Sequence, residues 1–182
     1  MDFRTKPISR EKIRAIACWV RTYLFKCKNK YYFDVIKALE LLPHKFSNVM
    51  VEIVLDDDPD LQDVPATTIP DMKGNYCIKI KETVYDDAYH KKNGGYRNHI
   101  MHEISHVILF MLGFLPHFDV AYGNKDLKPY ESIEWQAKAL AGEILIPYEA
   151  TKEMDYKTIK KRCKVSRDAA LNRVRLDKVI NR

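Results

Sequence analysis

The stretch IMHEISHVILF, residues 100–110, places two histidines and a glutamate inside an otherwise apolar run. Gly113 and Pro116 follow it, and its apolar residues recur at helical spacing, which predicts a helix from about Tyr96 to Leu112. A helix this apolar packs into a core, where an imidazole or a carboxylate is costly unless something pairs with it. A metal ion is the strongest such partner.

The spacing of the histidines supports a metal site. His102 and His106 are four residues apart, so a helix places both imidazoles on one face, where they can reach the same cation. Imidazole nitrogens in a near-tetrahedral arrangement suit Zn²⁺. Glu103 lies about 100° further around the helix, where it can act on a water molecule beside the metal without ligating it. This HExxH pattern is typical of zinc metalloproteases. A surface helix with two unrelated histidines is the alternative, and the apolar flanks argue against it.

A catalytic zinc site normally has three protein ligands and one open position. The stretch ESIEWQAKALAGEILIP, residues 131–147, predicts a helix over Ser132 to Leu145 and offers Glu131, Glu134 and Glu143. Glu134 belongs to the apolar side of this helix, and Glu131 falls near its start, where a carboxylate also favours the helix dipole. Each of these glutamates can equally be a capping or solvated charge.

The chain as a whole predicts an α+β architecture, with N-terminal helices, a small mixed sheet, the two helices above in a zincin-like arrangement, and short C-terminal helices. N-terminal helices are expected at 9–27, with Ser9 as N-cap, and from Tyr32 to Leu42, ending before Pro43. Strands are expected at 48–55 and 76–81. The second strand is a candidate edge for pairing with an extended substrate, although plain sheet packing is the alternative.

The net charge of +6 is concentrated at the end of the chain. Residues 151–182 hold 11 Lys or Arg against 4 Asp or Glu, whereas residues 1–150 hold 20 against 21. We therefore expect a zinc metallopeptidase domain over 1–150 and a basic helical segment over 151–182, with helices at 155–163 and 167–179 and Ser166 as a cap. These two helices resemble a helix-turn-helix, with Arg167, Asn172 and Arg173 facing outward, so DNA or a protein is a candidate partner. A solvated helical surface is the alternative.

Cysteine usage and the start of the chain bear on the compartment. Four cysteines lie far apart without a CxxC pair, which fits reduced thiols; they are Cys18, Cys27, Cys77 and Cys163. The opening MDFRTKPISREKIR is charged and lacks the apolar region of a secretory signal. No run of eighteen apolar residues is present. We therefore expect a cytoplasmic protein without a membrane partner.

HEISH at 102–106, followed by EWQAKALAGEILIP at 134–147, resembles the ImmA/IrrE family of metallopeptidases, whose second motif has the form E-x-x-A-N-x-F-A-x-x-L-L-M-P. IKIKETVYDDA and GYRNHIMHE, which precede and enter the first motif, are similar to the family's strand and helix lead-in. The resemblance implies Zn²⁺ held by His102, His106 and Glu134, with Glu103 as general base. It also implies a cytoplasmic regulator of phages or mobile elements that relieves repression by cleaving a helix-turn-helix repressor.

The second motif departs from the family pattern at four positions. Leu140, Ile144 and Ile146 replace other hydrophobic residues and keep the apolar stripe. Lys138 stands where the pattern has Asn. An ammonium has no acceptor and cannot receive the second ring N–H of a ligand histidine, as an amide oxygen could. Either a backbone carbonyl accepts that hydrogen bond or the histidines are oriented less firmly.

An oxyanion donor is also needed for peptide hydrolysis, and Tyr122, Tyr130 and His117 are candidates because they fall between the two helices. Each can equally be packing or loop structure. Two functions stay open: a zinc endopeptidase, and a non-catalytic regulator in which zinc only joins helices while the basic segment binds DNA or a partner. A structural zinc site usually has four protein ligands, and no further Cys or His has an obvious spacing, which favours the endopeptidase. Another kind of zinc hydrolase is a third candidate.

Overall fold

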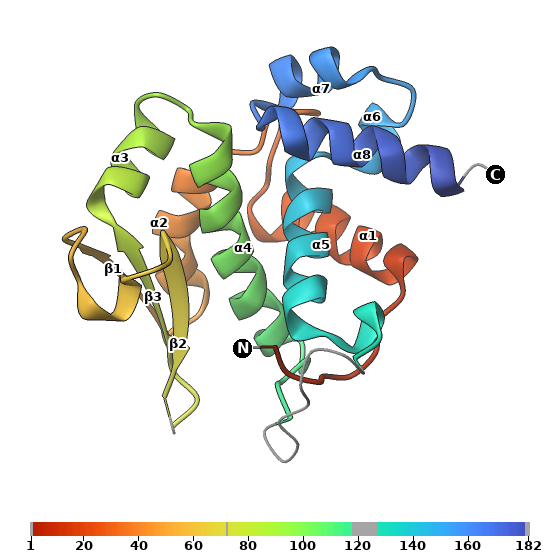
Figure 1. Ribbon diagram of the computed structural model, residues 1–182. Helices are drawn as coiled ribbons and strands as arrows, with labels where there is room; N and C mark the ends of the chain where they lie inside the picture. Colours follow the sequence, from red (N-terminus) through yellow and green to blue (C-terminus); the bar gives the residue numbers. More distant parts are fainter. Residues whose placement is uncertain (1, 72, 118–126, 181–182) are drawn as a thin grey trace.

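The computed structural model describes residues 2–71, 73–117 and 127–180 and has the predicted α+β architecture. Helix α4 (Gly94–Met111), which carries the HExxH pattern, lies at the centre (Figure 1). A three-stranded sheet lies on one side of it, and α5 (Ile133–Leu145) and α1 (Arg10–Trp19) lie on the other. Helix α5 packs directly against both α4 and α1. The two helices expected to carry the site are therefore neighbours.

Local sequence signals explain where α4 begins and ends. The Asn93 side-chain oxygen accepts hydrogen bonds from the backbone N–H groups of Gly95 and Tyr96, which is an N-cap. After Leu112 the chain reaches Gly113, whose φ of 82° lies in the left-handed region that glycine adopts without strain. The helix thus begins two residues before the predicted Tyr96 and ends beside the predicted Leu112.

Helix α5 begins one residue after the predicted Ser132, which is its N-cap, and ends at the predicted Leu145. Ser132 Oγ accepts from the backbone N–H of Trp135 at 2.9 Å and donates to Asp2 Oδ2 at 2.6 Å. The backbone N–H of Glu134 donates to Asp2 Oδ1 at 3.3 Å. Since a carboxylate favours the N-terminus of a helix, Asp2 ties the beginning of the chain to the first turn of α5.

The second N-terminal helix differs from the prediction at both ends, because it begins at Val35 rather than Tyr32 and does not stop at Leu42. Ser9 caps α1 as predicted, and a π-helical segment (Val20–Leu24) continues it. Helix α2 (Val35–Lys45) begins after Asp34 and runs through Pro43, so the expected stop before the proline is wrong. A proline in the last turn removes only one backbone hydrogen bond, and the buried side chain of Leu42 keeps the turn packed on the core.

The sheet has the order β1-β3-β2. Strand β1 (Val49–Val54) pairs in parallel with β3 (Tyr76–Lys81), and β2 (Ala66–Pro70) pairs antiparallel with β3. The predicted strands at 48–55 and 76–81 are confirmed, but the expectation that 76–81 is an edge is wrong because β3 is paired on both sides. The sequence analysis missed β2, whose signal is the β-branched run at 67–69 before Pro70.

The C-terminal helices α7 (Tyr156–Cys163) and α8 (Arg167–Ile180) are confirmed, and Ser166 Oγ accepts from the backbone N–H of Ala169. Both helices lie across the ends of α4 and α5 (Figure 1). Buried side chains of this segment, including Ile159, Cys163 and Ala170, share one hydrophobic cluster with α4 and α5. The remaining helical elements are η2 (Pro59–Leu61), α3 (Glu82–Tyr89), η3 (Pro129–Glu131) and α6 (Tyr148–Thr151). In the described part of the chain, no helix is both long and apolar enough to cross a membrane.

The first turn of α4 holds the turn between α7 and α8. The Arg97 side chain is 1% exposed and donates hydrogen bonds to the backbone oxygens of Phe33, Cys163 and Lys164. Gly94 lies so close to this turn that a Cβ atom would meet the carbonyl carbon of Val165 and lie 2.5 Å from the nitrogen of Ser166. The segment 163–166 is therefore held against α4 by the Arg97 side chain and by the close approach of Gly94.

We expect Gly94→Ala to lower the free energy of unfolding by about 1–3 kcal/mol, because the added methyl group must displace backbone atoms. Gly142→Ala is the matched control: Gly142 lies inside α5, and nothing lies within 4 Å of where its Cβ would be. Alanine favours a helix interior, so this control should raise the free energy by about 0.5–1 kcal/mol. Urea denaturation measures both. A stabilising effect of Gly94→Ala would contradict the close contact.

Candidate metal centre

Three side chains from α4 and α5 meet in one cluster. His102 Nε2 and His106 Nε2 are 3.1 Å apart. Glu134, in the first turn of α5, places Oε2 at 3.3 Å from His102 Nε2 and Oε1 at 3.2 Å from His106 Nε2. Candidate ligand atoms of the three residues all lie within 4.8 Å of one another. The structure thus brings together the three residues for which the sequence resemblance implies metal binding.

The cluster has the dimensions of a metal site. Zinc binds nitrogen and carboxylate oxygen at about 2.0–2.2 Å, so two ligand atoms at tetrahedral corners lie about 3.3–3.5 Å apart. The three separations of 3.1–3.3 Å are close to this value. Within the described part of the chain the group has three members, so no fourth protein ligand closes it. Two imidazoles and one carboxylate at these separations therefore fit a divalent metal ion.

Glu134 has the charge state that a metal ligand needs. Partial burial raises the pKa of its carboxyl, but His102 and His106 lower that pKa by more, so it lies below its usual range. Lys138 Nζ lies 3.8 Å from Glu134 Oε2, and the lysine side chain is 69% exposed. This is a weak surface pair on successive turns of α5. Lys138 thus faces the carboxylate of the cluster.

The other ring nitrogens of the two histidines lack the support that ligand histidines usually have. The Nδ1 atoms of His102 and His106 are buried, and neither has a hydrogen-bond partner among the described residues. An imidazole that binds a metal usually donates its second N–H to a carboxylate or a carbonyl. Here the rings are held by packing instead: the His106 ring lies 5.8 Å from that of Phe110. Among the described residues, no backbone carbonyl replaces the amide acceptor that Lys138 cannot supply, so hydrogen bonds at Nδ1 do not orient these two rings.

Glu103 lies beside the cluster without joining it. Its Oε1 is 3.9 Å from His102 Nε2, and its Oε2 accepts a hydrogen bond from Thr68 Oγ1 at 2.9 Å. The residue is 8% exposed, and this burial raises the pKa of its carboxyl to about 7, although His102 and the Thr68 hydroxyl lower it. A carboxyl with a pKa near neutrality can both take up and release a proton. Thr68 belongs to β2, so the sequence analysis missed it together with its strand.

The other two candidate carboxylates have different surroundings. Glu131 belongs to η3, where its backbone oxygen accepts from the N–H of Thr5. Glu143 is 2% exposed and lies at the opposite end of α5 from Glu134, where Arg10, Arg14 and Arg173 surround it. Its Oε2 is 2.9 Å from Arg173 Nη2. Of the three glutamates, Glu134 is the one in the cluster with the histidines.

The contacts described for His117 and Tyr130 lie outside the metal cluster. The His117 side chain is exposed, and its backbone N–H donates to the Arg4 oxygen. Tyr130 is 42% exposed, and Lys128 Nζ lies 5.8 Å from its ring centre. Tyr122 lies outside the described residues. The role of these three side chains therefore stays a prediction.

The candidate DNA-contacting residues of α8 divide into two groups. Arg167 and Asn172 are exposed as expected. Arg173 is 4% exposed, so the expectation that it faces outward is wrong. Its guanidinium pairs with Glu143 and donates to the backbone oxygen of Ile146 at 2.8 Å. A buried carboxylate needs a charged partner, and α8 supplies it from its inner face.

Comparison with known proteins agrees with this geometry. Residues 88–175, slightly less than half of the chain, match the model of the IrrE N-terminal-like domain, peptidase family M78. The matched stretch contains α4, α5 and the whole cluster, and it extends through α7 into α8. No curated protein matches the chain. The match confirms the resemblance to the ImmA/IrrE family and supports a metallopeptidase that acts on protein.

Proposed function

We propose that the protein is a zinc-dependent endopeptidase, because residues 88–175 match the IrrE N-terminal-like domain of peptidase family M78. One observation carries the proposal: His102, His106 and Glu134 form a three-member cluster beside the buried carboxyl of Glu103. Three ligands suit a catalytic zinc ion, whereas a structural zinc ion usually has four. The non-catalytic regulator with a closed zinc site is therefore less well supported.

The residues divide the chemistry between them. His102, His106 and Glu134 would hold Zn²⁺, which when bound polarises the scissile carbonyl and lowers the pKa of water. Thr68 Oγ1 donates a hydrogen bond to Oε2 of Glu103. The other carboxylate oxygen, Oε1, lies 3.9 Å from His102 Nε2 and would accept a hydrogen bond from the attacking water. Glu103 Oε1 takes a proton from that water as its oxygen attacks the carbonyl carbon. The same carboxyl then gives the proton to the leaving amine nitrogen as the peptide bond breaks.

The sheet offers a way to align the substrate. Strand β2 is at the end of the sheet, and among the described residues no strand pairs with its outer edge. Thr68, in the middle of β2, contacts Glu103 directly. An extended peptide that adds to this edge by main-chain hydrogen bonds would therefore pass close to Glu103. This assigns to β2 the role that the sequence analysis gave to residues 76–81.

We propose a helix-turn-helix transcriptional repressor as the substrate, cleaved so that repression is relieved. The resemblance of HEISH and EWQAKALAGEILIP to the ImmA/IrrE family supports this choice. A cytoplasmic regulator carried by a phage or mobile element fits such a substrate.

The test compares wild type with His106→Ala, both for zinc content and for new N-termini that mass spectrometry detects in cells containing helix-turn-helix repressors. Wild type should hold about one zinc ion per chain and create a new N-terminus within a repressor. His106→Ala should lose most of the zinc and all of the cleavage, because two ligands hold the ion poorly. The control is His99→Ala, on the same helix but exposed and outside the cluster, and it should keep both.

Two results would contradict the proposal. If His106→Ala keeps its zinc, the ion is bound elsewhere. If wild type binds zinc but produces no new N-terminus in any protein, the non-catalytic regulator is the better description.

A further inference from the structure

A cavity of about 700 Å³ lies where the turn between α7 and α8 meets the start of α4. We call it the α4–α7 cavity. No Asp or Glu among the described residues lines it, and six cationic residues do: Lys92, Lys157, Lys160, Lys161, Lys164 and Arg167. The candidate metal centre contributes no residue to its lining. The cavity is thus a second feature of the molecule, with a different chemistry.

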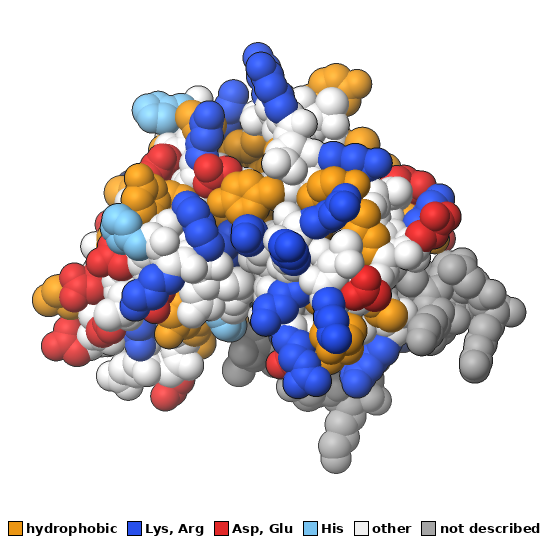
Figure 2. Space-filling view, turned by 90° about the horizontal axis from the view of Figure 1, so that it is seen from above, with side chains coloured by type: hydrophobic (Ala, Val, Ile, Leu, Met, Phe, Trp, Pro, Cys, Tyr) orange, Lys and Arg blue, Asp and Glu red, His pale blue; other side chains and the backbone are white. Residues whose placement is uncertain are grey.

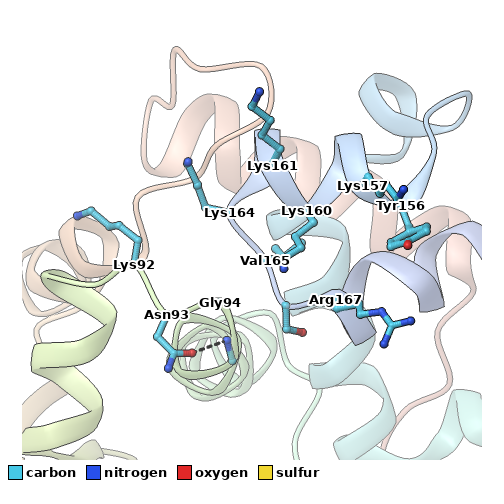
Figure 3. A pocket seen from close by; sticks show the side chains of 12 residues that line it. Lys92, Asn93, Gly94, Tyr156, Lys157, Lys160, Lys161, Lys164, Val165 and Arg167 are labelled. Atoms are coloured by element: carbon cyan, nitrogen blue, oxygen red, sulfur yellow. Dashed lines mark hydrogen bonds between the residues drawn. The ribbon is translucent and has the colours of Figure 1, made fainter.

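The cations come from segments that are far apart in the sequence. Lys92 precedes α4, Lys157 lies in the first turn of α7, and Arg167 begins α8. In Figure 3 the side chains are spread out, from Lys92 on one side of the first turn of α4 to Lys157 and Arg167 on the other. The close contact of Gly94 with the α7–α8 turn keeps these segments in place. The positive charge is therefore extended rather than gathered at one point.

Local structure does not explain all of this charge. Lys160 and Lys161 stand in the last turn of α7, where cations favour the helix dipole. Lys92 and Arg167 stand at the starts of helices, where the same dipole disfavours a cation. All six side chains are exposed, and within the described part of the chain none of them forms an ion pair. A negatively charged partner would compensate them.

The surroundings of the cavity favour a polyanion. Figure 2 shows Lys and Arg side chains gathered across the middle of this face, with few acidic side chains among them. Tyr156 and Val165 are the apolar side chains of the lining, and Val165 is 3% exposed. Protein interfaces are built around apolar and aromatic anchors, whereas DNA interfaces are more polar and much more positive. A single phosphate group would need cations that converge on one point.

We infer that the face around the α4–α7 cavity binds the sugar-phosphate backbone of duplex DNA without regard to base sequence. The lysines and Arg167 pair with successive phosphates and displace counterions. This inference does not depend on the proposed peptidase activity. If both hold, DNA binding brings the enzyme to the molecule on which a repressor sits.

The test is fluorescence anisotropy with a labelled mixed-sequence duplex of about 20 base pairs, titrated between about 50 and 200 mM salt. Each phosphate contact contributes about −0.9 to the slope of log K against log salt, so six contacts give a slope of about −5. The variant Lys157→Gln/Lys160→Gln/Lys164→Gln should bind at least about tenfold more weakly, with a slope of about −3. Lys92→Gln, which changes a different segment, should reduce the slope by about 1.

The matched control is Lys37→Gln/Lys45→Gln/Lys73→Gln, which removes the same charge from exposed lysines outside the cavity and should bind nearly as wild type does. Urea denaturation of every variant checks folding. Equal weakening by both triple variants would overturn the inference, because net charge alone would then explain the binding. Failure of wild type to bind the duplex at about 50 mM salt, or tighter binding of polyglutamate than of the duplex, would overturn it as well. Tighter binding of polyglutamate would indicate an acidic protein partner.

Discussion

Glu103→Gln is expected to lower the rate of peptide cleavage by about 10²- to 10⁴-fold, the usual contribution of a general acid–base group. A glutamine side chain has nearly the same shape and can still accept the hydrogen bond from Thr68, but a neutral amide cannot take a proton from water. Zinc content should stay unchanged because Glu103 is not a member of the ligand cluster. The measurements are kcat/KM on a peptide spanning the cleavage site, and zinc per chain.

The control for this substitution is Glu131→Gln. Glu131 was an alternative ligand candidate in the same stretch of sequence, and it lies outside the cluster in η3. It should keep both cleavage and zinc. Full activity of Glu103→Gln would show that another group acts as the base, whereas loss of zinc from it would show that Glu103 is a ligand.

The second large effect is expected on stability. Arg173→Met should lower the free energy of unfolding by about 3–5 kcal/mol, because it leaves the carboxylate of Glu143 buried without its closest cation. In this variant Arg14 Nε still lies 3.4 Å from Glu143 Oε1 and partly compensates its charge. We therefore expect a loss of stability toward the lower end of this range. The measurement is urea denaturation followed by circular dichroism, with zinc content as a check that the metal centre persists.

Two further variants distinguish charge from packing. Arg167→Met changes an exposed arginine on the same helix and should alter the free energy of unfolding by less than about 0.5 kcal/mol. The double variant Arg173→Met/Glu143→Leu removes both buried charges and should regain much of the lost stability. Equal effects of Arg173→Met and Arg167→Met would mean that the buried ion pair contributes little.

Local patterns predicted the helices that matter most. Ser9 is the N-cap of α1 as predicted, and the predicted helix start at Ser132 is the N-cap of α5, because a capping side-chain oxygen acts over only three residues. The i, i+4 spacing of His102 and His106 predicted that their rings would meet, since helix geometry alone sets that distance. The same reasoning failed at Pro43, where burial of the last turn of α2 outweighs the local cost of the proline.

Capping and spacing act within a few residues, so they could not predict contacts between segments that are far apart in the sequence. In YCIKIK, residues 76–81, Ile78 and Ile80 alternate with lysines, a pattern that suits a central strand as well as an edge strand. The pattern therefore did not reveal that β1 and β2 pair with this strand on both sides. The sequence does not distinguish Arg173 from the exposed arginines of the same basic helix, because its burial depends on the contact between α8 and Glu143 of α5. The hydrogen bond from Thr68 to Glu103 joins residues 35 positions apart.

Local patterns in the amino-acid sequence were sufficient to predict the α+β class, the helix that carries both histidines, and the position of Glu103 beside them, because periodicity and capping act within a few residues. Tertiary packing brings Glu134 to the two imidazoles, places β2 at the sheet edge beside Glu103, and encloses Arg173 while the lysines of α7 stay exposed. Those outcomes depend on how helices and strands bury their apolar faces against one another, and this packing is a property of the whole chain.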